Sequence, residues 1–277
     1  WFPSVCPVEE LYKGILGFTL YDRKKNFHLL IKKNVIPKYS PYFFGKETIG
    51  SSNLLGPFET NLMGHHNILN STAAIIASLL IGISEEKIFY ALKSFQGVRR
   101  RFTWLGDIKK SSLFDDYAHH PTEIKATYEI AKSLKESDIV SGVINETRKD
   151  ELRVKWKNII GVFQPHRFSR TKNLYNDFIE ILKKFDVLYI LDIYPAGEKS
   201  IKGVNSQKLV KDLKKKNSQV YYLKKNTNIN KILSSHYNEE NIIIFMGAGS
   251  ITHEAHKIKT ENKGLFGKFG KYNRVHL

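Results

Sequence analysis

Residues 115–123, Asp-Asp-Tyr-Ala-His-His-Pro-Thr-Glu, place two carboxylates and two imidazoles within six consecutive positions. Side chains of these types can exchange protons, hold a ligand or bind a divalent metal. The preceding residues 111–114 (Ser-Ser-Leu-Phe) predict a short strand, and Pro121 suits the first turn of a helix. Ligands of open α/β sheets bind beyond the carboxyl ends of the strands, so we expect a functional site here. The alternative is a solvated loop or helix cap, which is ordinary for a single Asp or His.

A second polar run at 164–171, Gln-Pro-His-Arg-Phe-Ser-Arg-Thr, follows another apolar segment and precedes a helical pattern. Arg167 and Arg170 could hold an anion such as a carboxylate, because a guanidinium donates two parallel hydrogen bonds. The alternative is a helix cap or an ion pair between loops. A third run at 192–198, Asp-Ile-Tyr-Pro-Ala-Gly-Glu, adds two carboxylates after a further predicted strand.

The stretch at 64–70, Gly-His-His-Asn-Ile-Leu-Asn, opens a predicted helix, on which Asn67 and Asn70 share one face. A carboxamide both donates and accepts, so it can match the N6/N7 edge of adenine. The alternative is a capping asparagine followed by an ordinary polar residue. The run 99–101 holds three arginines, which could clamp phosphate or could be solvated surface.

A glycine-rich turn, Gly-Ala-Gly-Ser at 247–250, follows an apolar strand. It is a weak dinucleotide signal, because Thr252 stands where the third glycine belongs. We expect close packing or a phosphate-tolerant turn. The 277 residues contain no G-x-x-x-x-G-K-[ST] run, so none of them is expected to form a P-loop.

The pattern of apolar residues changes near Arg101. Before it we expect a β-rich start with a hairpin over 17–31, then two helices. These helices are 67–80 and one capped by Ser84, whose buried face is expected to hold Ile88, Ala91, Leu92 and Phe95. After it, apolar strands alternate with amphipathic helices, which predicts an α/β, Rossmann-like, doubly wound and mostly parallel sheet. The expected strands are 113–117, 159–163, 187–193, 220–223 and 242–246, and the helices are 122–134, 172–184 and 206–213.

Composition excludes some classes of protein. The formal charge is +17, but the lysines and arginines are interleaved with acidic residues, so we expect small polyanions rather than nucleic acid as partners. No apolar run approaches the ~18 residues of a membrane span, and no signal peptide is evident, so we expect a cytoplasmic protein with no membrane partner. The single cysteine excludes an intrachain disulfide and fits a reducing compartment.

Two further interpretations stay open on these residues. One is a metal-dependent hydrolase that uses the acidic and histidine side chains of 115–123, although adjacent His119 and His120 would point in different directions. The other is a basic nucleic-acid-binding module, which would bind in a salt-sensitive way.

In their order, the runs at 64–70, 97–102, 115–123, 164–171 and 192–198 resemble the Mur ligase family, in particular its L-alanine-adding branch. The resemblance covers roughly residues 55–251. It implies that 1–101 is the end of the family's central α/β ATP-binding domain. Residues 102–277 would then be the C-terminal Rossmann-like domain, with an insertion near 138–157. The UDP-sugar domain and the P-loop would be absent and the chain does not begin with Met, so we expect a fragment, inactive alone, with the missing domains as a partner.

The resemblance also implies the chemistry of peptidoglycan precursor synthesis. A carboxylate of UDP-N-acetylmuramic acid attacks the γ-phosphate of ATP to give an acyl phosphate, and the amine of L-alanine then displaces phosphate. ATP and Mg²⁺ are the implied cofactors, and no catalytic residue or protein metal site is assigned. The implied roles are adenine binding by His66, Asn67 and Asn70; ATP phosphate or ribose binding by Arg100 or Arg101; ribose binding by Asp116; and alanine binding by Tyr117, His119, Arg167 and Arg170.

Overall fold

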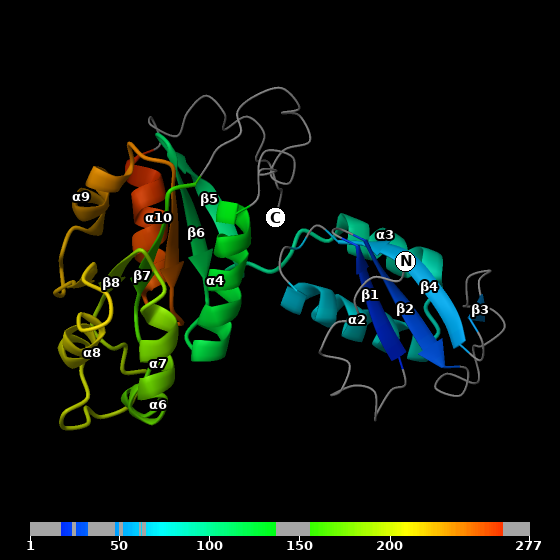
Figure 1. Cartoon of the computed structure of the whole chain (residues 1–277), viewed down its shortest axis with the longest axis horizontal. Helices are drawn as coiled ribbons and strands as arrows, with labels where there is room; N and C mark the ends of the chain where they lie inside the picture. Colours follow the sequence, from blue (N-terminus) through cyan, green and yellow to red (C-terminus); the bar gives the residue numbers. More distant parts are fainter. Residues whose placement is uncertain are drawn as a thin grey trace. The chain divides into compact units, whose positions relative to one another are not determined.

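The computed structural model describes residues 18–23, 26–32, 48–49, 52–60, 62, 65–136 and 156–262. It divides into two compact units, Trp1–Gly97 and Val98–Leu277 (Figure 1). Arg100 and Arg101 therefore belong to the second unit. Some of the residues discussed above lie outside the described ones. They are Gly64, most of the charged insertion predicted near 138–157, and the tail from Lys263 onward. No helix among the described residues is long and apolar enough to cross a membrane.

The described residues of the first unit form an antiparallel sheet in the order β1-β2-β4-β3 and the helices α2 and α3. The predicted hairpin strands are confirmed as an antiparallel pair, in which Phe18 lies opposite Ile31 and Arg23 opposite Asn26. The elements are β1 (Phe18–Arg23), β2 (Asn26–Lys32), β3 (Thr48–Ile49), β4 (Ser52–Glu59), α2 (His65–Leu80) and α3 (Glu85–Ser94).

The two predicted helices of the first unit are confirmed, but two details of α3 are corrected. Ser84 occupies the N-cap position, yet its side chain makes no capping hydrogen bond. Of the predicted buried face, Ile88 is buried and Leu92 is half-buried, whereas Ala91 and Phe95 are exposed. Phe95 lies past the last helical turn in extended backbone, so helical spacing does not determine where its ring points.

The second unit is the predicted α/β fold. Its six-stranded sheet has the order β5-β6-β10-β7-β8-β9, in which β5 is antiparallel to β6 and the other pairs are parallel. The helices α4, α7 and α8 pack side by side, while α10 packs on β5, β6 and β10 and contacts α9 (Figure 1). The strands are β5 (Thr103–Ile108), β6 (Ser111–Asp116), β7 (Asn158–Phe163), β8 (Val187–Ile190), β9 (Val220–Tyr222) and β10 (Asn241–Met246). The helices are α4 (Pro121–Glu136), α6 (Phe168–Asn173), α7 (Tyr175–Leu182), α8 (Ser206–Leu213), α9 (Ile229–Leu233) and α10 (Ile251–Glu261).

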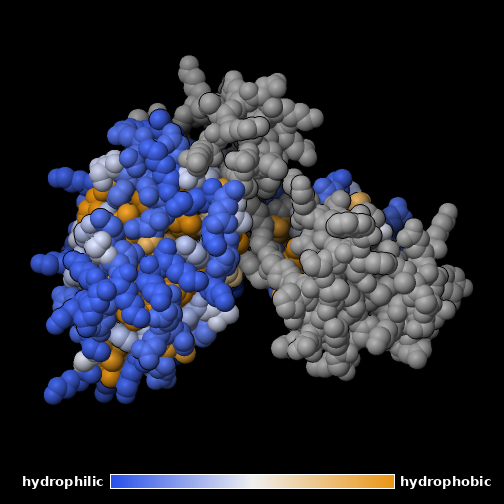
Figure 2. Space-filling view, in the orientation of Figure 1, coloured by the Kyte–Doolittle hydropathy of each residue, from blue (hydrophilic) through white to orange (hydrophobic). Residues whose placement is uncertain are grey.

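Burial explains why β10 is an almost continuous apolar run, since all six of its residues are buried, as expected for a parallel strand covered on both faces. Every residue of β6 is buried too, although four of its six residues are Ser or Asp. Around them the visible surface of the second unit is dominated by hydrophilic residues (Figure 2). Strand β5 and helix α10 were not predicted, and the single helix predicted at 172–184 is two helices that meet at Leu174.

The parallel strands end in register. Met246 of β10 lies opposite both Asp116 of β6 and Phe163 of β7, and Phe163 lies opposite Ile190 of β8. The loops that follow these strands therefore start at one level along a single edge of the sheet. This edge carries the runs at 115–123, 164–171, 192–198 and 247–250.

Candidate functional site at the carboxyl ends of the strands

The turn after β6 is in part a helix cap. His120 precedes α4, and its Nδ1 accepts a hydrogen bond from the Thr122 N–H at 3.3 Å. Glu123 reaches back to accept from the N–H groups of His119 and His120, at 3.0 and 3.2 Å, in the manner of a capping box. Although burial raises it, these two N–H groups and the charges of His119 and Arg101 bring the pKa of Glu123 below its ordinary value. His120 and Glu123 thus hold the turn at the start of α4.

Asp116 lies inside the fold, only 5% exposed. Its Oδ1 accepts from the Ala118 N–H at 2.9 Å, and its Oδ2 accepts from the Phe102 N–H and the Thr127 hydroxyl at 3.0 and 2.9 Å. Burial raises the pKa of Asp116, while these three donors act against that rise. Both oxygens are engaged, so the geometry favours a role in tying β6 to α4 and to the residues before β5. The ribose role implied by the resemblance stays a prediction.

Asp115 lies on the other face of β6, because successive strand residues point to opposite faces. It is 1% exposed, and its Oδ1 accepts from the Thr252 hydroxyl at 3.1 Å. Its Oδ2 lies 3.8 Å from Arg100 Nε and 4.0 Å from His256 Nε2. Burial raises the pKa of Asp115 against the charge of Arg100. The pair of aspartates therefore does not form one carboxylate cluster.

The neighbouring arginines differ in what they can reach. Arg100 donates from Nη2 to the Gly247 carbonyl at 2.6 Å, and its guanidinium lies 4.6 Å from the centre of the Tyr117 ring. The side chain of Arg101 is 51% exposed, with Nη1 3.7 Å from Glu123 Oε1. Of the two arginines proposed for ATP, Arg101 is therefore the more exposed, and Arg100 connects the start of the unit to the strand ends.

A row of rings joins three of the loops. The His119 ring lies 5.5 Å from the His166 ring, which stacks on Tyr194 at 5.5 Å with an interplanar angle of 12°. Arg170 donates from Nη1 to His166 Nδ1 at 3.2 Å. Because arginine can only donate, His166 Nδ1 carries no proton here. Burial first, then the charges of His119, Arg170 and Arg167, lower the pKa of His166 below its ordinary value.

His119 has the opposite arrangement of protons. Its Nδ1 lies 2.9 Å from the Tyr117 carbonyl and 3.2 Å from Glu123 Oε2, and both of these are acceptors. His119 therefore donates from Nδ1, and its Nε2 is free to accept when the ring is neutral. Tyr117, predicted to bind substrate, lies edge-on to His119 at 5.1 Å and under Arg100.

Arg167 begins the loop-to-helix turn of α6 with a φ of +72°. Its N–H donates to the Tyr194 carbonyl at 2.8 Å, and its half-exposed guanidinium lies 3.7 Å from Glu198 Oε1. Glu198 also accepts from the Ser169 hydroxyl and N–H, which lower its pKa below the ordinary value. The loop at 192–198 thus supports the turn that carries both arginines.

The glycine-rich turn is required by close packing. A Cβ on Gly247 would lie 2.8 Å from the Gln164 carbonyl, and Gly247 has a φ of +150°. A Cβ on Gly249 would lie 2.5 Å from Gln164 Oε1 and 2.6 Å from Tyr194 Cγ. Gln164 Oε1 in turn accepts from the Ile251 N–H at 3.1 Å. The close-packing interpretation of 247–250 is therefore confirmed.

The predicted adenine-binding residues lie in the first unit, on the first two turns of α2. Asn67 is half-buried and Asn70 is exposed, and the described backbone is helical through both, so they share one helix face. The side chain of His66 lies outside what the structure describes. The adenine roles of His66, Asn67 and Asn70 stay predictions.

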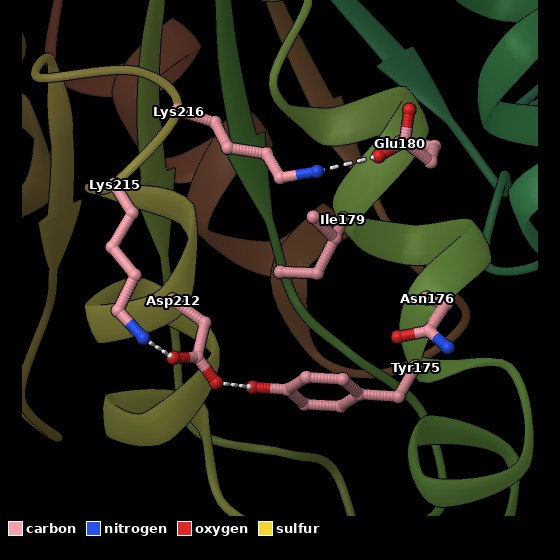
Figure 3. Close-up of a pocket in the computed structure, with 7 residues that line it drawn as sticks. All are labelled: Tyr175, Asn176, Ile179, Glu180, Asp212, Lys215 and Lys216. Carbon is pink, nitrogen blue, oxygen red and sulfur yellow. Dashed lines mark hydrogen bonds and ion pairs between the residues drawn. The ribbon is translucent and has the colours of Figure 1, made fainter.

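A pocket of about 370 Å³ lies elsewhere, between α7 and α8 (Figure 3). Figure 3 shows its charged side chains paired with one another, Glu180 with Lys216, and Asp212 with Lys215 and Tyr175. None of the residues predicted from the sequence lines it. Its charges are spent on each other, so the strand ends remain the candidate site.

The described part of the chain contains no cluster of metal-binding side chains. No group of three His, Cys, Asp or Glu side chains there could hold a metal ion. Asp115 and Asp116 face opposite sides of the sheet, and His120 Nδ1 is spent on the helix cap. The geometry therefore gives the hydrolase interpretation no support.

Comparison with known proteins points to the part of the chain that carries these strand-end loops. The family described as "Mur ligase, glutamate ligase domain" matches residues 100–249, more than half of the 277-residue chain. The chain belongs to the Mur ligase family. The resemblance stated from the motifs is thereby confirmed.

Several relatives support this membership. The UDP-N-acetylmuramate–L-alanine ligase of Aquifex aeolicus is 38% identical over 224 residues, which are 81% of this chain and 44% of that protein. The enzyme of the same name from Brachyspira hyodysenteriae is 37% identical over 233 residues, 83% of this chain and 46% of that protein. The crystal structure of the Thermotoga maritima UDP-N-acetylmuramate–alanine ligase shares the fold, with a TM-score of 0.60 at 23% identity, over 89% of this chain and 46% of that one. The chain spans less than half the length of these relatives.

Two side chains of this Mur ligase site had no role assigned from the sequence. His166 and Tyr194 stood inside the quoted motifs, but neither was separated from its neighbours as a candidate. Their position in the sequence could have indicated them, since each comes shortly after the end of a predicted strand, as Arg167 does. Only the pairing of the two loops shows that the rings stack.

Removal of the Asp116 carboxylate tests its structural role. We predict that Asp116→Ala lowers the free energy of unfolding by roughly 1–3 kcal/mol, because two buried N–H groups lose their acceptor. Urea denaturation of the chain measures this. Glu129→Ala is the matched control, since Glu129 is exposed on α4 and a surface change costs about 0.5 kcal/mol or less. Equal losses in the two variants would contradict the assignment.

The low pKa of His166 gives a pH prediction. In the folded chain the neutral ring is favoured, so its contribution to stability is present above its unfolded pKa of about 6.5 and is lost as pH falls through the folded pKa. NMR titration of His166 should give a midpoint below 6.5, and Arg170→Leu should raise it part of the way back because burial remains. A midpoint at or above 6.5, or no change in Arg170→Leu, would refute this.

Proposed function

We propose that this chain carries the adenine-binding and amino-acid-binding parts of an ATP-dependent ligase that joins L-alanine to UDP-N-acetylmuramic acid in peptidoglycan precursor synthesis. The observation that carries the proposal is the row His119–His166–Tyr194 with Arg167 and Arg170 beside it. The row lies at the strand-end edge of a Mur ligase fold. The names of the L-alanine ligase relatives support the choice of amino acid.

The row offers complementary groups to an amino acid. Arg167 and Arg170 supply planar, cationic donors for the carboxylate. His119 presents Nε2 as an acceptor toward the amine, with Nδ1 held by the Tyr117 carbonyl and Glu123. Such an acceptor can take the proton that the ammonium group must lose before the nitrogen attacks.

ATP when bound supplies the phosphoryl group that activates the carboxylate of the sugar substrate. In this proposal His66, Asn67 and Asn70 hold adenine, and Arg101, rather than the engaged Arg100, reaches the phosphates. Asp116 contacts ribose only by sharing an oxygen that it already uses within the fold. The 277 residues contain no P-loop run, so the phosphate cradle is proposed to come from residues outside this sequence.

Mg²⁺ has less support within the chain. Since the described residues hold no cluster of three metal-binding side chains, no step is assigned to the ion through them. Mg²⁺ is bound through few carboxylates together with substrate phosphates, so its place would be beside the phosphate cradle.

The test is a fusion that supplies what the chain lacks. The N-terminal part of the Aquifex aeolicus relative, up to the start of the matched region, is joined to the full 277-residue chain. We expect phosphate release that requires ATP, UDP-N-acetylmuramic acid and L-alanine together, with the N-terminal part alone as the blank. Release that ignores L-alanine would contradict the proposed substrate, and full-rate ligation by the 277 residues alone would contradict the incomplete site.

The arginines give a sharper prediction in that fusion. Arg167→Ala and Arg170→Ala should raise the KM for L-alanine roughly ten- to a hundredfold, since each removes a charge-assisted hydrogen bond of about 1.5–3 kcal/mol. The KM for ATP should change far less. Lys172→Ala, an exposed cation on the same helix, is the control and should change neither KM. Equal rises in both KM values would count against the assignment.

A further inference from the structure

Tyr194 is held in place by its backbone on both sides. Its N–H donates to the Pro165 carbonyl at 2.8 Å, and its carbonyl accepts from the Arg167 N–H at 2.8 Å. His166, between those two residues, forms a parallel β-bridge with Tyr194. The ring of Tyr194 therefore faces His166 as a consequence of how the two loops pair.

The ring is also held by packing. It stacks on His166 at 5.5 Å with planes 12° apart, and it leaves no room for a Cβ at Gly249, which would lie 2.6 Å from its Cγ. The ring already lies against the backbone of Gly249, so it cannot move further toward the glycine turn. Although Tyr194 is 39% exposed, its ring is therefore in contact with His166 on one side and with the glycine turn on another.

The stacking of Tyr194 on His166 affects the position of Arg170, because Arg170 is hydrogen-bonded to His166. Arg170 donates from Nη1 to His166 Nδ1 at 3.2 Å and to the His166 carbonyl at 3.4 Å. The plane of the imidazole fixes where its Nδ1 lone pair points, and so fixes the position of Nη1. The guanidinium is planar and rigid, so its remaining N–H donors are aimed by the same contact.

We propose that Tyr194 is a positioning residue for the amino-acid carboxylate. Its ring sets the plane of His166, His166 holds Arg170, and Arg170 presents its free donors to the carboxylate. This inference rests on the proposed function and deepens it. The positioning role explains why Tyr194, whose side chain makes no polar contact with Arg167 or Arg170, stacks on the loop that carries both arginines.

The kinetic test uses the fusion described above. Tyr194→Leu removes the ring, and the KM for L-alanine should rise about three- to tenfold, the worth of one aromatic stack. The KM for ATP and kcat should stay within twofold. Tyr194→Phe keeps the ring and should restore the KM for L-alanine. Tyr221→Leu is the matched control, because Tyr221 is equally exposed at 39% and stacks on Tyr189 away from these loops.

A second measurement uses the 277-residue chain alone. In Tyr194→Leu the NMR titration midpoint of His166 should rise toward 6.5, because the ring loses burial. Its Nδ1 should become protonated in part as the contact with Arg170 loosens.

The outcomes separate the two proposals. If the unmodified fusion ligates L-alanine and Tyr194→Leu changes neither its KM nor the His166 titration, the inference fails and the proposed function stands. Equal rises of the KM for ATP and for L-alanine would also overturn it. If the unmodified fusion shows no dependence on L-alanine, the proposed function fails, and the assignment of Tyr194 to an amino-acid carboxylate fails with it.

Discussion

The common register of the parallel strands is the constraint on which the site depends. Asp116, Met246 and Phe163 end β6, β10 and β7 at one level, and Ile190 continues that level into β8. A slip of one residue in any pair would turn every side chain of that strand to the other face. The strand that aligns the others, β10, comes last in the chain and lies in the middle of the sheet. The loops at 115–123 and 164–171 therefore meet only after a long-range pairing, and no local interaction could bring them together.

The charged residues at this edge divide into those that hold loops and those that stay free. Asp115, Asp116 and Glu123 spend their oxygens on backbone N–H groups, on hydroxyls or near Arg100. Burying carboxylates is costly, and burial raises the pKa values of both aspartates, so their hydrogen bonds fix geometry rather than add much stability. These hydrogen bonds hold the loops around the side chains that still have donors or acceptors to offer a ligand, which are His119, Arg101, Arg167 and Arg170.

Sequence reasoning reached the fold and the loops but not every side chain. The strands at 159–163 and 242–246 were predicted to within a residue, because buried parallel strands are continuous apolar runs. Strand β5, Thr-Trp-Leu-Gly-Asp-Ile, was missed because it is a half-polar edge strand with a bulge. In the site, the motif at 115–116 could not tell which aspartate faces which helix. The stacking of Tyr194 on His166 was also beyond reach, since it arises between loops that no local pattern pairs.

The two histidines of the row complement each other in a way that suits a zwitterion. His119 donates from Nδ1 and keeps Nε2 as an acceptor, whereas His166 accepts at Nδ1 and so carries its proton on Nε2. A protonated His166 would lose its lone pair for Arg170 and would place a second positive charge beside the guanidinium. Its lowered pKa is therefore a condition of the geometry as well as a result of it. An edge with a proton acceptor at His119 and aimed cationic donors at Arg167 and Arg170 can distinguish the ammonium end of an amino acid from its carboxylate end. A simple anion site could not make that distinction.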